Sequence, residues 1–68
     1  MPAVKNFKDA KHVAESFLEK KGIKKFSVEG VVLQGTIWKL RLVGPESTSH
    51  IVEIDADTGE VVGYRERM

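Results

Sequence analysis

Apolar residues recur at helical spacing near the start of this chain. From Phe7 to Leu18 they fall every third or fourth position, which places them in one stripe on a helix. Asn6 precedes the stripe and is suited to cap the first turn, and Gly22 follows it and is suited to end the last. The pattern predicts a helix at about residues 7–21, after a loose lead-in over residues 1–5.

Beyond the helix, apolar and polar residues alternate, as they do in strands that bury one face. Gly30 interrupts the first alternating run and indicates a β-bulge there. The facing of the three apolar residues after it, Val31, Val32 and Leu33, stays open. In all, four runs predict strands at about residues 26–33, 36–43, 50–56 and 60–66.

Residues 50–66, HIVEIDADTGEVVGYRE, carry the clearest signal, because two alternating runs flank a short polar turn. We expect a type I turn over residues 56–59, with Gly59 in the left-handed position. This register places two cross-strand pairs on the buried face, Ile54 with Val62 and Val52 with Tyr64.

One helix followed by four strands with short connections predicts an α+β domain of order α-β-β-β-β. We expect one domain over residues 1–68, a four-stranded antiparallel sheet with the N-terminal helix packed across one face. Its predicted core combines helical and strand residues, namely Phe7, Ala14, Phe17, Leu18, Trp38, Leu40, Val52, Ile54, Val62 and Tyr64. A chain this short buries only about 60% of its unfolded surface, so a well-packed monomer and a homodimer both stay open.

Composition narrows the classes of function. The chain has no cysteine and two histidines, which argues against a disulfide and a structural zinc site. Its net charge of +1 argues against electrostatic capture of nucleic acid or of a membrane surface, so we expect neither as a partner. The charge is uneven, since residues 1–25 hold seven lysines and three acidic residues, and residues 26–68 hold four basic and seven acidic residues.

Location follows from what the chain lacks. No apolar run approaches the roughly 20 residues that span a membrane, and the first residues have no apolar signal-peptide core. The sequence as given therefore reads as cytoplasmic. A piece of a longer secreted protein would read the same way, so an extracellular location stays open.

An alternating apolar run leads into Asp-Ala-x-Thr-Gly-Glu-Val at residues 55–61, and a strand around Trp38 precedes it. This arrangement resembles the PepSY domain over about residues 7–66. The resemblance implies a small non-enzymatic domain, and a peptidase-inhibiting or regulatory role has been proposed for that family. No binding residue is carried over from it.

Candidate chemical groups are sparse. Asp55, Asp57 and Glu60 begin like a calcium loop, but a strand follows at once, so we interpret them as turn residues with Asp57 accepting backbone N–H bonds and Asp55 solvated. We interpret His12 and His50 as surface residues, because spacing links neither to a nucleophile or a carboxylate. We therefore expect no catalytic residue, no metal site and no cofactor, and predict that the protein is not an enzyme.

The outer face of the predicted sheet is the strongest candidate for function, because a single helix leaves it uncovered. We predict a protein-docking or self-association surface there, with an exposed sheet edge as a related route. Its predicted residues are Ile37, Lys39, Arg41, Val43, Ile51, Glu53, Val61 and Arg65. The alternative function is a nucleic-acid-binding domain that uses the basic helix. The outer face could also be an ordinary, half-apolar sheet surface without a binding role.

Overall fold

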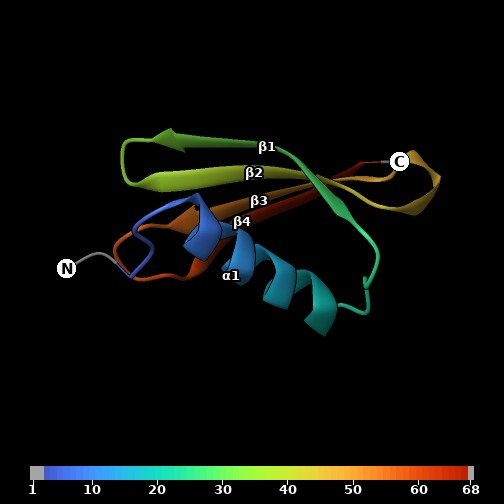
Figure 1. The fold of residues 1–68 in the computed structure, drawn as a ribbon, viewed down its shortest axis with the longest axis horizontal. Helices are drawn as coiled ribbons and strands as arrows, with labels where there is room; N and C mark the ends of the chain where they lie inside the picture. The colour runs from blue at the N-terminus through green and yellow to red at the C-terminus, as the bar shows by residue number, and fades with distance from the viewer. Residues whose placement is uncertain (1–2, 68) are drawn as a thin grey trace.

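The computed structural model of this protein describes residues 3–67 as one helix and a four-stranded sheet (Figure 1). Helix α1 spans Phe7–Lys20, and a short 3₁₀ turn, η1, spans Pro45–Ser47 between the second and third strands. The strands pair antiparallel in the order β1-β2-β3-β4, so that β1 and β4 form the two edges. Their bounds are Ser27–Gln34, Ile37–Val43, Ser49–Asp55 and Val61–Arg67. The predicted α+β fold is confirmed.

Local signals set both ends of α1, as predicted. The side chain of Asn6 accepts a hydrogen bond of 3.0 Å from the backbone N–H of Asp9, and the Asp9 carboxylate accepts one of 3.2 Å from the backbone N–H of Lys5. Such a cap typically contributes about 1 kcal/mol. At the other end Gly22 has φ +88°, and the N–H of Ile23 donates to Leu18 O at 3.0 Å. Within the described residues, no helix is long and apolar enough to cross a membrane.

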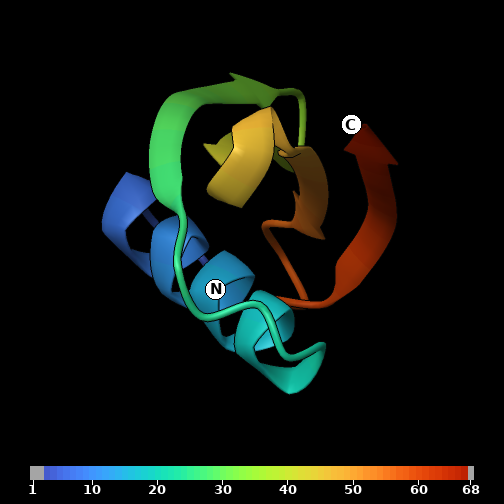
Figure 2. The ribbon, with the colours of Figure 1, turned by 90° about the vertical axis from the view of Figure 1, so that its right-hand side faces the viewer.

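The core lies between α1 and the inner faces of β2 and β3 (Figure 2). Ala10, Ala14 and Leu18 are fully buried on the helix, and the two small alanines let its backbone approach the sheet. Burying one leucine side chain is worth about 1.5–3 kcal/mol. The fully buried strand residues are Leu40, Leu42, Val52 and Ile54. Phe7 was predicted to join them but is 53% exposed, although it lies on the same helical stripe as Ala14 and Leu18.

The segment before the helix is ordered against the second hairpin, which corrects the expected loose lead-in. Val4 is 2% exposed, and its N–H donates to Ala56 O at 3.0 Å. The indole N–H of Trp38 donates to Val4 O at 3.4 Å. Residues 1 and 2 lie outside the described residues. The buried valine thus closes the end of the core at which β3 turns into β4.

The predicted bulge in β1 is confirmed, and it decides the facing that the sequence left open. The register shifts between Val28 and Gly30, which brings Val31 opposite Leu40. Val28 and Val31 therefore pack on the core, whereas Val32 lies opposite Lys39 on the outer face and is 51% exposed.

A second bulge, between β3 and β4, overturns part of the predicted hairpin register. Val52 pairs with Tyr64 as expected, but Ile54 pairs with Val61, and Val62 is the extra residue. Val62 is consequently 56% exposed, and Val61 packs against the core. The cause is the turn, where Asp55 N donates to Glu60 O at 2.9 Å and Gly59 N to Asp55 O at 2.8 Å. The hairpin thus closes one residue earlier than predicted, and the bulge restores the pairing of Val52 with Tyr64.

We expect Gly59→Val to lower the free energy of unfolding by more than about 1 kcal/mol, because a β-branched residue resists positive φ. Gly59 has φ +77°, and an added Cβ would lie 3.3 Å from Ala3 Cβ. Gly30→Val is the matched control, since Gly30 has no positive φ and an added Cβ there meets nothing within 4 Å. Urea unfolding of both variants measures the difference. Equal stability of the two variants would contradict the role given to Gly59.

Candidate functional site

Helix α1 covers one face of the sheet (Figure 2). The opposite face, here called the outer face, carries the alternate side chains of each strand. Across β2, β3 and β4 these side chains form rows of cross-strand partners, because the strands pair in register there. The three rows are Lys39–Glu53–Gly63, Arg41–Ile51–Arg65 and Val43–Ser49–Arg67.

Seven of the nine residues in these rows line an open hollow of about 460 Å³ on the outer face. A volume of that size is in the range of pockets that hold a small ligand or a few side chains. Ile51, in the middle row, is only partly exposed, and Gly63 has no side chain, so the carboxylate of Glu53 lies over it. The lining residues are Lys39, Arg41, Ser49, Ile51, Glu53, Arg65 and Arg67.

The hollow is strongly cationic, with four basic side chains and one carboxylate. Lys39, Arg41, Arg65 and Arg67 are all exposed. Among residues 3–67, none of these four forms an ion pair within 4.0 Å. Adjacent strands lie about 4.8 Å apart. The Cα atoms of Arg41 and Arg65, on the strands that flank Ile51, are therefore about 10 Å apart. Guanidinium groups in such positions are suited to bidentate bonds with carboxylates or phosphates.

The structure brings together most of the predicted docking residues. Lys39, Arg41, Ile51, Glu53 and Arg65 line the hollow, and Ile37 and Val43 lie at the two ends of the same face of β2. The placement of Val61 was wrong, because the unpredicted bulge turns its side chain to the core.

Two lining residues, Ser49 and Arg67, were missed. Each lies one residue beyond the strand limits that the sequence predicted. Alternation alone would have found Arg67, since it lies two positions after Arg65 on the same strand and therefore on the same face. The charge count over residues 26–68 also gave no sign of a cationic surface, because the acidic residues there outnumber the basic ones and lie mainly at the turns.

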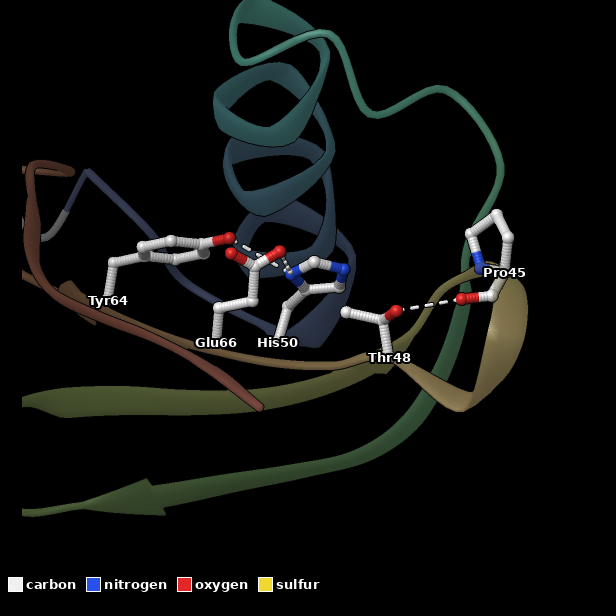
Figure 3. Close-up of polar contacts among 5 residues, drawn as sticks. All are labelled: Pro45, Thr48, His50, Tyr64 and Glu66. Atoms are coloured by element: carbon white, nitrogen blue, oxygen red, sulfur yellow. Dashed lines mark hydrogen bonds and ion pairs between the residues drawn. The ribbon is translucent and has the colours of Figure 1, made fainter. Parts of the chain in front are cut away.

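The inner side of β3 and β4 holds a polar cluster that the sequence did not predict (Figure 3). His50 is 2% exposed, which corrects its assignment to the surface, whereas His12 is exposed as predicted. The Nδ1 atom of His50 lies 2.9 Å from the hydroxyl of Tyr64 and 3.9 Å from Oε1 of Glu66. His50 is buried because it shares the inner face of β3 with Val52 and Ile54.

Tyr64 connects this cluster to the end of the helix. Its ring meets the Phe17 ring edge-on, with centroids 5.2 Å apart, and the ammonium of Lys21 lies 4.8 Å from the Tyr64 centroid. Burial raises the pKa of the Tyr64 hydroxyl above its usual value, and the nearby Glu66 carboxylate adds to the rise. The cluster therefore holds the end of α1, β3 and β4 together and does not line the hollow.

The acidic turn is used for local backbone bonds. Oδ1 of Asp55 accepts from the N–H of Asp57 at 2.8 Å and from that of Thr58 at 3.3 Å. The roles of the two aspartates are thus the reverse of those predicted, since Asp55 makes the turn bonds. Within the described part of the chain, no three His, Asp or Glu side chains gather in a group that would hold a metal ion.

Comparisons with protein-family models, curated proteins and solved structures found no match to this chain.

We expect Tyr64 to ionise at higher pH in the folded protein than in the urea-unfolded chain, because burial and Glu66 both disfavour the tyrosinate and so raise its pKa. It is the only tyrosine, so tyrosinate absorbance reports on it alone. Since the folded-state pKa is raised, its contribution to stability is complete below about pH 10 and is lost as pH rises through the folded-state value.

Glu66→Gln separates the two causes. It should lower the Tyr64 midpoint but leave it above that of the unfolded chain, because burial is the larger cause. Identical midpoints in the folded and unfolded states would contradict the packing described for this ring.

Proposed function

We propose that this domain is a small non-catalytic protein-interaction module that docks its outer face on an acidic segment of a partner protein. One observation carries the proposal: four exposed cations without ion-pair partners among residues 3–67 surround the partly buried Ile51 in a hollow of about 460 Å³. Arginine is enriched at protein interfaces and among the residues that contribute most to binding.

The shape and charge of the hollow favour a protein over a single-stranded nucleic acid. Its lining contains no aromatic side chain for bases to stack on, since Trp38 and Tyr64 pack on the inner face. Glu53 places a carboxylate within the hollow, which would repel a continuous phosphate backbone. A peptide with spaced acidic residues and aliphatic neighbours matches both features.

The same lining supports a role without catalysis. Among residues 3–67, Ser49 is the only residue lining the hollow that has a hydroxyl, and the next residue, His50, faces the opposite side of the sheet, where it contacts Tyr64. The Glu53 carboxylate lies over Gly63, two cross-strand rows away from Ser49. Within this part of the chain, no base therefore stands beside the hydroxyl. The resemblance of the hairpin to PepSY domains adds peptidases to the partners worth testing.

The second candidate is nucleic-acid binding through the basic helix. Lys8 and Lys11 are exposed and have no carboxylate partner among residues 3–67. The ammonium of Lys21, in contrast, lies against the rings of Phe17 and Tyr64, which reduces the freely presented charge at the end of the helix. The two candidates use different faces, so separate variants distinguish them.

Selection from a random linear-peptide display library tests the proposal and does not require the partner to be identified first. We expect enriched peptides to carry acidic residues spaced by aliphatic ones. The double variant Arg41→Glu/Arg65→Glu should reduce their affinity at least about tenfold, because it replaces two anion-binding groups by repelling ones. Lys8→Glu/Lys11→Glu is the matched control, since it changes the same charge on the helix and should leave peptide affinity within about twofold.

Three results would overturn the proposal. They are no enrichment of acidic peptides, equal binding by the outer-face variant, and tighter binding of a single-stranded oligonucleotide that only the helix variant loses. The last result would establish the nucleic-acid alternative. Thermal unfolding of each variant shows whether a lost signal reflects lost folding.

A further inference from the structure

The two edges of the sheet differ in how they are protected. The free edge of β4 carries Arg65, Glu66 and Arg67, and charged residues on an edge discourage pairing with another chain. The edge of β1 from Gly30 to Gln34 carries no charge and no proline. Val32 and Leu33 are 51% and 50% exposed there. Figure 1 shows β1 on the side of the sheet away from the helix, with no other described segment along this edge.

In this segment, backbone N–H and C=O groups point to the free edge at every second residue, where another strand can bind them. Gly35 has φ +61° and opens the two-residue turn between the paired residues Gln34 and Ile37, as in a type II′ hairpin. The pair that flanks such a turn is hydrogen-bonded, and hydrogen-bonded and free positions then alternate along an antiparallel ladder. The backbone groups of Val31 and Leu33 therefore point to the free edge.

We propose that a second copy of this chain adds its own β1 to this edge, antiparallel, about a two-fold axis at Val32. In this register Val31 of each copy faces Leu33 of the other through backbone hydrogen bonds, and the two Val32 side chains meet on the outer face. The pairing is self-complementary, as a two-fold interface requires, and brings no like charges together. The bulge at Gly30 ends the pairing, which limits it to five residues of each chain.

Two other ways of pairing the sheet edges of two copies are less favourable. Pairing of β4 with a second β4 brings several arginines of two copies close together. Pairing of β1 with β4 of another copy leaves one free edge at each end and continues into an open chain of molecules. Two five-residue segments bury less than a stable interface of about 1,200 Å² needs, so the dimer should dissociate on dilution. The pairing of the two β1 edges does not depend on what binds the outer face.

Cysteine cross-linking tests the register, because the natural chain contains no cysteine. The two Val32 Cα atoms would form a pair without backbone hydrogen bonds, at about 4.5 Å, which a disulfide can span. We expect Val32→Cys to give a covalent dimer under mild oxidation. Leu33→Cys is the control, since it is equally exposed but lies opposite Val31 in the dimer. Equal cross-linking of both variants, or of neither, would overturn the register.

Sedimentation equilibrium over a concentration series tests the association itself. Wild-type protein should pass from monomer to dimer with rising concentration. Val32→Glu should stay monomeric, because it places two carboxylates at the two-fold axis, whereas the uncharged Val32→Gln should retain dimers. Within one chain a glutamate there faces Lys39, so the substitution suits the fold of the monomer. A wild-type monomer at every concentration, or growth beyond the dimer, would overturn the inference.

Discussion

Burial of one helical stripe against the inner faces of β2 and β3 is the interaction on which this structure depends. Ala10, Ala14 and Leu18 lose all contact with solvent there, and the opposing strand residues do the same. A single helix can cover only one face of a four-stranded sheet (Figure 2). The outer face and the two edges therefore remain as surfaces that the chain itself does not satisfy, and both proposals concern them.

Periodicity predicted the elements because it is a local property. The helix stripe, the cap at Asn6 and the left-handed Gly22 are all readable within a few residues, and the structure confirms them. Register is not local, because it depends on how a turn closes and where a bulge absorbs the extra residue. The burial of Val61 and the exposure of Val62 show this, since one unpredicted bulge reversed the prediction made for each of them.

The candidate site was predictable to the same extent. Alternation along β2 and β3 placed Lys39, Arg41, Ile51 and Glu53 on one face correctly, because those two strands pair without a shift. The concentration of positive charge was not evident, because a linear count mixes the two faces with the turns. The burial of His50 was predictable from the same alternation, because His50 lies two positions before Val52 on the predicted strand. Its place beside a polar loop suggested the surface, and the strand pattern was the stronger signal.

Strand β4 carries residues of the inner polar cluster on one face and residues of the hollow on the other. Tyr64 and Glu66 meet His50 on the inner side, while Arg65 and Arg67 point into the hollow, so the inner cluster positions the strand that presents two of the four cations.

The pairing of two β1 edges would place two such hollows on one continuous sheet. With two β1 strands joined, the outer faces of both copies lie on the same side of one sheet, and five strand spacings of about 4.8 Å separate their β3 strands by about 24 Å. A partner with two acidic segments at that spacing would engage both hollows, and its second contact would form at a high effective concentration. Weak association at the edge and weak binding in each hollow would then reinforce one another.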